Sequence, residues 1–183
     1  DESIPLEDLL ADPVAEATSF AGQPHPLIPL PAALYAPFRA NAQGMDLADA
    51  GVRALLLKAL DDSRQRSYAA APQVPGGPPA KSSRPATNPA DREEVVGLVE
   101  DASPAHIDLA LACAVAGAPE WAATPVRVRA ACLERAAEAL ERAAPEFMAL
   151  LVREAGKTWS AALSEVREAV DYCRYYAARA LLD

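Results

Sequence analysis

Residues 165–177 read Glu-Val-Arg-Glu-Ala-Val-Asp-Tyr-Cys-Arg-Tyr-Tyr-Ala, and the apolar positions in and around this stretch recur every three or four residues. Such spacing predicts an amphipathic helix. The apolar face of that helix comprises Leu163, Val166, Val170, Cys173, Ala177 and Leu181. Glu168 and Asp171 lie off this stripe and are expected to face a different surface. Thr158 or Ser160 is expected to cap the start of the helix.

Two shorter helices are predicted immediately before it. The first is expected to begin at Pro125 and to carry Glu138 and Arg142 on its outer face, one helical turn apart. Its inner face would consist of Ala130, Leu133, Ala137, Leu140 and Ala144. Pro145 should open the second helix, and Gly156 should end it as a left-handed cap.

Another helix and a strand are predicted further upstream. Ser103 is a suitable N-cap, Pro104 suits the first helical turn, and Gly117 with Pro119 should end that helix. Its apolar stripe would be Ile107, Leu111 and Val115. The short apolar run at 95–99 predicts a strand that needs a partner strand to be stable. A turn is expected before it at Asn88-Pro89-Ala90-Asp91.

The N-terminal half is expected to be less regular. Residues 1–45 are rich in proline, which fixes φ and removes a backbone donor, so a continuous helix or central strand is excluded there. A brief helix entered by Pro5 is expected over residues 6–10, and residues 25–31 are expected to form a strap over another surface. Asp46, with Asp49 in an approximate capping box, should start a connector helix within 46–68. Residues 69–87 are predicted to be an irregular low-complexity linker.

Bulk properties exclude several classes of function. The net charge of −9 and the alternation of basic with acidic residues argue against nucleic-acid binding, which needs clustered Lys and Arg. The three cysteines are too few and too scattered for a disulfide framework or a metal site. No apolar run is long enough to span a bilayer, and no signal-peptide pattern is present. We therefore expect a cytoplasmic protein.

The order of motifs in the second half of the chain resembles the aldehyde dehydrogenase superfamily. The matching segments are Asn88–Asp91, Val95–Gly97, Trp121–Pro125 with Arg129 and Leu133, Arg153–Thr158 and Glu165–Ala177. The last of these is similar to the L-glutamate γ-semialdehyde dehydrogenase branch. In that family the corresponding helix lines the entrance for the aldehyde. The resemblance implies an α/β fold for the complete enzyme, of which this segment is the mainly helical part with a short β element and a Pro-rich irregular N-terminal part.

Upstream segments resemble the bifunctional bacterial enzymes of the proline utilisation A family. Asp1-Glu2, Pro5-Leu6, Leu9 and Asp12-Pro13 look like the exit from a proline dehydrogenase barrel. Pro29–Pro31, Leu34-Tyr35 and Arg39–Leu47 look like the connector to the second module, with Ala42 in place of an expected Ser. The implied division is a connector at 1–45, a connector helix at 46–68, a linker at 69–87 and an incomplete dehydrogenase domain at 88–183.

That family oxidises proline with FAD and then oxidises the semialdehyde to glutamate with NAD, through a cysteine nucleophile. The resemblance implies that this chain stops before the strand that receives NAD, the catalytic Cys and the general-base Glu. The chain begins without Met and ends within a helical pattern, so we expect an excerpt. We expect it to bind neither cofactor, to be inactive alone, and to act with the rest of the same polypeptide in a homo-oligomer that can also associate peripherally with a membrane.

Glu168 is the candidate site residue. By resemblance it points into the aldehyde pocket, where an acid could hold the substrate's ammonium or the iminium of its cyclic form. The alternative is a solvated helix carboxylate that pairs with Arg167 or Arg174. Tyr172, Tyr175 and Tyr176 are assigned to packing rather than chemistry.

The remaining chemically capable residues receive structural assignments. Cys113, Cys132 and Cys173 are expected to pack in the core as small apolar side chains. His25 and His106 lack a second ligand at helical spacing, and His106 is expected to be exposed. Gly76-Gly77 does not fit a phosphate loop. Lys157 near the negative end of a helix explains the Glu154–Lys157 turn without an anion.

A second hypothesis from a different class is a stand-alone helical interaction module without catalytic activity, whose Pro-rich strap binds a partner. Autonomous, cooperative folding would favour this hypothesis over an excerpt.

Overall fold

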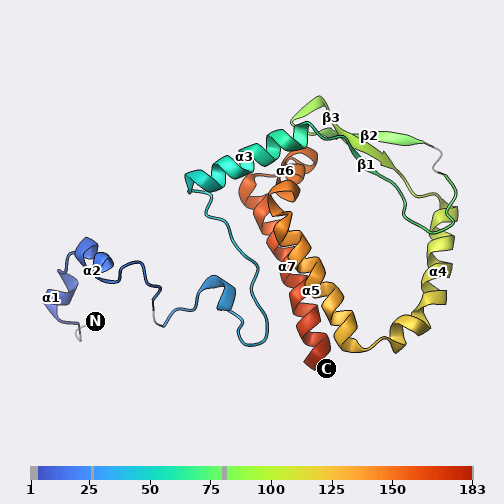
Figure 1. Cartoon of the computed structure of the whole chain (residues 1–183). Coiled ribbons are helices and arrows are strands. Elements are labelled where there is room, and N and C mark those ends of the chain that lie inside the picture. Colours follow the sequence, from blue (N-terminus) through green and yellow to red (C-terminus); the bar gives the residue numbers. More distant parts are fainter. Residues whose placement is uncertain (1–3, 26, 80–81, 183) are drawn as a thin grey trace.

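The computed structural model describes residues 4–25, 27–79 and 82–182. The expectations for Asp1-Glu2, for Pro26 in the strap and for Lys81 in the linker therefore lie outside the described residues. Across the described residues the chain is mostly helical with one small sheet (Figure 1), as predicted.

The C-terminal third is a helical hairpin with a short helix at its closed end. α5 (Val126–Arg142) and α7 (Trp159–Leu182) run side by side in opposite directions, and α6 (Ala144–Ala155) lies at one end of the pair (Figure 1). Ala137 of α5 and Val170 of α7 are completely buried together with Ala42 from the preceding connector. The small alanine side chains allow the backbones to approach closely, which explains why an Ala-rich sequence can build this core.

The boundaries of these helices agree with the sequence predictions. Gly156 adopts φ 63°, the left-handed conformation, at the end of α6, and the N–H of Lys157 bonds the carbonyl of Leu151 at 3.3 Å. A Cβ on Gly156 would lie 2.9 Å from the ring of Pro89, so glycine is required both for conformation and for space. Thr158 rather than Ser160 caps α7, because its hydroxyl accepts the N–H of Ala161 at 3.2 Å.

A second core cluster joins α3 (Ala50–Arg64) to the hairpin. Leu56 of α3 packs against Met148 of α6 and Val166 of α7, all of them buried. The expectation that Asp46 caps this helix was wrong. Asp49 is the N-cap and accepts the N–H of Val52 at 2.8 Å, while the carboxylate of Asp46 accepts the N–H of Ala48 and forms the turn before it.

The sheet has the order β1-β3-β2 and is built from β1 (Tyr68–Ala70), β2 (Ser83–Asn88) and β3 (Asp91–Glu100). β2 and β3 form an antiparallel hairpin, and β1 pairs parallel to β3. The turn predicted at 88–91 is confirmed, since Asn88 Oδ1 accepts the N–H of Ala90 at 2.9 Å. Gly97 permits β1 to approach, because a Cβ there would lie 2.6 Å from the carbonyl oxygen of Tyr68.

The prediction of an irregular linker over 69–87 was wrong at both ends of that range. β1 occupies its start and β2 its end, and the strand predicted at 95–99 extends over ten residues. Pro85 suggested a loop, but β2 is an edge strand, where the missing proline N–H leaves no central ladder bond unmade. β3 pairs with a partner strand on each side, in agreement with the prediction that this apolar strand is not isolated.

α4 (Pro104–Ala123) is longer than predicted and stands apart from the hairpin (Figure 1). It continues through Gly117 and Pro119, and this was possible because residues 111–123 are exposed, so that water can bond the carbonyl groups that proline leaves without an N–H partner. Its predicted apolar stripe is not packed either: Val115 is 74 % exposed. The expected core packing of Cys113 was wrong for the same reason.

His106 was also predicted wrongly, since it is buried. Its Nδ1 lies 3.1 Å from the N–H of Ser103, so it completes a capping box at the start of α4, and its Nε2 lies 2.8 Å from the carbonyl oxygen of Pro78. The segment before β2 folds over the helix start and covers the ring, which helical periodicity alone could not reveal. Cys173 packs against the core around Val170, as expected, and Cys132 is half-buried.

A buried ionic network links the sheet to α3 and α6. The guanidinium of Arg153 donates from Nε to Glu94 at 2.8 Å, and from Nη1 to the carbonyl and hydroxyl oxygens of Ser63 at 2.7 and 2.9 Å. Asn88 donates to the second oxygen of Glu94 at 2.6 Å, and the hydroxyl of Tyr68 donates to Ser63 at 3.1 Å. The side chain of Arg153 on α6 thus joins this helix to β3 and α3.

The N-terminal segment extends away from the other elements (Figure 1). It contains α1 (Leu6–Leu9), close to the helix predicted after Pro5, α2 (Pro13–Ser19), and the 3₁₀ turn η1 (Pro31–Ala33). The sequence analysis missed α2, although Asp12 caps it by accepting the N–H of Val14 and Pro13 occupies its first turn. Every described residue from 4 to 38 is exposed.

Among the described helices, none alone combines the length and apolar character needed to cross a bilayer; α4 and α5 meet that criterion only when taken together as a pair bent by 114°.

Candidate functional site

The candidate site residue Glu168 lies on α7, and residues 39–45, the last part of the connector, run along the same helix. Asn41 and Ala42 of this segment are buried, and Ala42 packs against Ala137 and Val170 of the hairpin. Two acidic residues, one on each helix of the hairpin, hold the connector in place, and we call these two contacts the connector clamps.

The first connector clamp is centred on Asp171 of α7. Its carboxylate accepts from the guanidinium of Arg39 at 2.6 Å and from the backbone N–H of Ala42 at 3.0 Å. Arg39 also lies over the ring of Tyr35, 4.0 Å from its centroid. Asp171 therefore lies off the apolar stripe, as predicted, and the surface it faces is the connector.

The second connector clamp is centred on Glu141 of α5. Arg174 of α7 donates to both of its carboxylate oxygens, at 2.8 and 2.7 Å, and the N–H of Gln43 donates to one of them at 2.9 Å. Arg174 further bonds the carbonyl of Asn41 at 3.3 Å. The guanidinium of Arg174 holds the pKa of Glu141 below its usual value, and the same carboxylate raises the pKa of Arg174.

Glu168 lies on α7 one turn before Asp171, and its side chain is exposed. The alternative in which Glu168 pairs with Arg174 was wrong, because Arg174 is bound to Glu141. Arg167 has a buried Nε with no hydrogen-bond acceptor among the described residues. Glu168 is thus free to meet groups outside the described residues, which is compatible with the predicted role without testing it.

Three tyrosines continue the exposed surface of α7 beyond Glu168. The rings of Tyr172 and Tyr176 are stacked with centroids 6.2 Å apart, and Tyr175 meets Tyr176 edge to face at 5.2 Å. Each is roughly half exposed. Within the described residues they pack chiefly on one another rather than in a core, so the predicted packing role is only partly met.

The other candidates have structural surroundings. Nδ1 of His25 accepts the N–H of Leu27 at 3.1 Å in the exposed N-terminal segment. Gly77 lies against the ring of His106, where an added Cβ would come within 3.0 Å. Lys157 pairs with Glu165 of α7 at 2.5 Å, next to the helix end where a cation was expected. No group of three or more His, Cys, Asp or Glu that could bind a metal occurs among the described residues.

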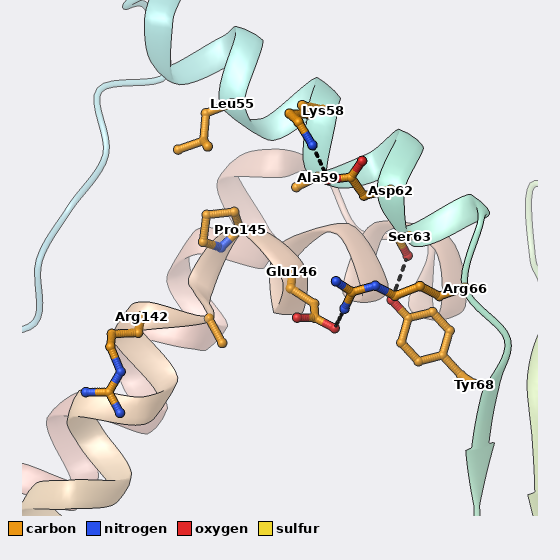
Figure 2. A pocket seen from close by; sticks show the side chains of 11 residues that line it. Leu55, Lys58, Ala59, Asp62, Ser63, Arg66, Tyr68, Arg142, Pro145 and Glu146 are labelled. Carbon is orange, nitrogen blue, oxygen red and sulfur yellow. Dashed lines mark hydrogen bonds and ion pairs between the residues drawn. The ribbon is translucent and has the colours of Figure 1, made fainter.

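A hollow of about 340 Å³ lies between α3 and the start of α6 (Figure 2). Four of its charged side chains pair with one another: Lys58 with Asp62 at 2.5 Å on α3, and Arg66, which follows α3, with Glu146 of α6. Figure 2 also shows the hydroxyl of Tyr68 directed at Ser63, which belongs to the buried network around Arg153. The hollow is therefore best explained as a helix contact with surface ion pairs.

The partners in both connector clamps were not predicted from the sequence. Arg39 and Asp171 are 132 residues apart, and neither residue belongs to a motif that indicates the other. The position of Arg174 in the sequence did indicate a buried ion pair. It falls beside the apolar stripe of α7, and a cation in that position is buried only if an acid meets it. The periodicity of α7 could therefore have predicted a buried ion pair, but not its partner.

Comparison with known proteins places this geometry in a family. The aldehyde dehydrogenase family model matches residues 78–182, more than half of the chain. The chain belongs to the aldehyde dehydrogenase family. This family member is 45% identical to the bifunctional protein PutA of Klebsiella aerogenes over 97% of its own length, and spans 14% of that protein. The predicted resemblance to proline utilisation A is thereby confirmed.

Relatives named as 1-pyrroline-5-carboxylate dehydrogenases match less of this aldehyde dehydrogenase chain. 1-Pyrroline-5-carboxylate dehydrogenase 2 of Bacillus subtilis is 49% identical over 49% of the chain and 18% of that enzyme. A Thermus 1-pyrroline-5-carboxylate dehydrogenase solved with bound NAD is 31% identical, with a TM-score of 0.70, over 79% of this chain and 28% of that one. A variant of proline utilization A from Bradyrhizobium japonicum is 36% identical, with a TM-score of 0.58, over 97% of this chain and 15% of that one.

Proposed function

We propose that this chain is part of a bifunctional proline-catabolic enzyme that oxidises proline with FAD and then oxidises L-glutamate γ-semialdehyde to glutamate with NAD. The observation that carries the proposal is the extent of the match. The bifunctional relative aligns with 97% of the chain, including the N-terminal segment, whereas the B. subtilis dehydrogenase aligns with about half.

Within that enzyme the chain is proposed to connect the two catalytic modules and to form part of the dehydrogenase scaffold. Residues 1–45 would form the connector after the flavin barrel, 46–68 the connector helix, 69–87 the linker region and 88–183 the beginning of the dehydrogenase domain. The connector clamps support this role, because they bind a segment that leads from one module to a helical hairpin of the other. No catalytic residue is assigned to the chain.

The residues described here are not proposed to hold either cofactor. Gly76-Gly77 is followed by two prolines and contacts the buried His106, so its backbone N–H groups do not form a cradle at a helix start. The nucleotide and the flavin are proposed for the remainder of the polypeptide. The enzyme is further proposed to be a cytoplasmic homo-oligomer, and the free thiols of Cys113, Cys132 and Cys173 favour a reducing compartment.

Glu168 is proposed to line the aldehyde entrance and to attract the substrate's positively charged nitrogen. Its exposed position supports this role, together with the fixed orientation that the connector clamp at Asp171 gives to the same turn of α7. A charge-assisted contact is worth about 1.5–3 kcal/mol when it is shielded from water. Glu168 would thus contribute to substrate binding and not to bond making.

The proposal is tested with the full-length protein that contains this chain and with the 183-residue chain alone. The full-length protein should reduce its flavin with proline and should form NADH from L-glutamate γ-semialdehyde. The isolated chain should do neither, because the flavin barrel and the cysteine nucleophile are both proposed to lie in the remainder of the polypeptide. NADH formation by the isolated chain, or failure of the full-length protein to oxidise proline, would overturn the proposal.

The role of Glu168 is tested by Glu168→Gln in the full-length protein. We expect the KM for the semialdehyde to rise about tenfold with kcat little changed, since a ground-state contact to the substrate is lost. Glu165→Gln is the matched control, because Glu165 lies one turn earlier on α7 and pairs with Lys157. An equal effect of both substitutions would show that Glu168 acts only through the general charge of the helix.

A further inference from the structure

The N-terminal segment exposes an unusual concentration of apolar side chains. We call residues 4–38 the arm, with residue 26 outside the described part. Its large apolar residues are all exposed, from 45 to 86 %: Ile4, Leu6, Leu9, Leu10, Val14, Phe20, Leu27, Ile28, Leu30, Leu34, Tyr35 and Phe38. Single exposed apolar residues are ordinary, but so many in one segment mark a surface that another surface covers.

The arm is acidic as well as apolar. The first 38 residues contain six of the 26 acidic residues and none of the 17 basic residues of the chain. Glu7, Asp8, Asp12 and Glu16 lie on and beside α1 and α2, interleaved with the apolar side chains. A complementary surface would be apolar at its centre, with Lys or Arg at its rim.

The comparisons indicate which relatives share the arm. The Thermus dehydrogenase leaves about a fifth of this chain without a structural counterpart, whereas the bifunctional protein from B. japonicum covers 97%. The B. subtilis dehydrogenase aligns with 49% of the chain and the family model with residues 78–182, whereas the K. aerogenes bifunctional protein aligns with 97% of the chain, so the arm is largely shared with the bifunctional relative. Every described residue of the arm is exposed.

The composition of the arm also favours docking. It contains seven of the 17 prolines, which restrict the unbound chain and reduce the entropy lost on binding. The connector clamp at Asp171 fixes Arg39, the residue that follows the arm. The arm therefore starts from a fixed point on the dehydrogenase module and reaches outward.

Resting on the proposed function, we propose that the arm docks on the proline dehydrogenase module of the same polypeptide, on an apolar surface bordered by Lys or Arg. Docking buries the leucines around α1 and places the acidic residues against the basic border. A second copy of this chain is a poorer partner, because it carries the same excess of acid.

Hydrogen–deuterium exchange measured by mass spectrometry tests the docking. Amides of residues 4–25 should exchange about tenfold more slowly in the full-length protein than in the 183-residue chain, because docking protects their backbone. Equal rates in the two proteins would overturn the proposal. So would protection that appears in the 183-residue chain as its concentration is raised, because this would assign the arm to a second copy.

The double substitution Leu9→Asp and Leu10→Asp in the full-length protein should abolish this protection. Leu57→Asp is the matched control, since Leu57 is similarly exposed but lies on α3, and it should leave protection of the arm unchanged. Protection that survives the double substitution would overturn the proposal. Proline oxidation and NADH formation are measured on the unsubstituted full-length protein as well: both activities together with an unprotected arm in that protein would refute the docking alone, whereas absence of proline oxidation would refute the proposed function.

Discussion

Arg153 is the residue on which the contact between sheet and helices most depends, because it bonds both Glu94 and Ser63 while almost fully buried. Arg153→Met should lower the free energy of unfolding by about 2–3 kcal/mol, since Glu94 and the carbonyl of Ser63 lose a charged partner. Urea unfolding followed by circular dichroism measures the change. Arg142→Met is the control: Arg142 is exposed and 4.0 Å from Glu138, and its loss should matter by less than about 0.5 kcal/mol.

Two glycines allow a matched test of backbone conformation. Gly156→Ala should destabilise the protein by more than about 1 kcal/mol, because the residue has positive φ and its Cβ would meet Pro89. Gly117→Ala should stabilise α4 by about 0.5–1 kcal/mol, because this glycine lies within the helix with open space around it. Thermal unfolding of the two variants should shift in opposite directions, and a shared direction would contradict this explanation.

Two acidic residues make the fold sensitive to acid. Arg174 holds the pKa of Glu141 below its usual value, and the side chains of Asn88 and then Arg153 do the same for Glu94. Because these pKa values are lower in the folded state, the stability they provide is present above the unfolded-state value of about 4.3 and is lost as the pH falls through the folded-state values. Unfolding free energies measured from pH 6 down to pH 3 should fall less steeply in Glu141→Gln than in the unsubstituted protein.

At the level of single residues, the sequence correctly predicted the roles of residues that act on their near neighbours in the chain. Gly156 and Thr158 act within a few residues of their own position, so propensity and capping rules identified them. His106 and Arg174 depend on partners 28 and 33 residues away, and their burial could not be predicted from their neighbours in the sequence. The role of Glu168 likewise came from resemblance and awaits its test.

Among the elements, α4 differs most from the hairpin of α5 and α7. It packs against little of the described chain and exposes Ile107, Leu111 and Val115, whereas α5 and α7 bury their apolar faces on each other. In the isolated chain the amides of α4 should therefore exchange at least about ten times faster than those in the middle of α7. Equal protection of the two helices would mean that α4 has a partner within the chain.

The elements that the sequence predicted well are those whose apolar residues face a partner within the chain. The α5–α7 region follows helical periodicity because both sides of each contact are present. β1 and β2 were missed because their residues have weak strand propensity, and they form only where the ladder of β3 offers hydrogen bonds. The end of α4 was placed too early, because Gly117 and Pro119 were expected to stop a helix that continues through both.

At the scale of the whole molecule, the described residues form two small core clusters and leave many large apolar side chains exposed. The isolated chain should unfold with low cooperativity and should bind a hydrophobic dye, because helices of this length depend on tertiary packing. Calorimetry and dye fluorescence measure both properties. A sharp, cooperative transition in a monodisperse chain would favour the alternative of an autonomous interaction module.

The connector clamps also set a rule for how this chain tolerates insertions and deletions. The consecutive N–H groups of Ala42 and Gln43 bond acids on two different helices. One extra residue between these positions would put one of the two bonds out of register, whereas a residue added in the exposed stretch before Arg39 would disturb neither. The chain before Arg39 can therefore vary in length, whereas the direct succession of Ala42 and Gln43 has to be kept.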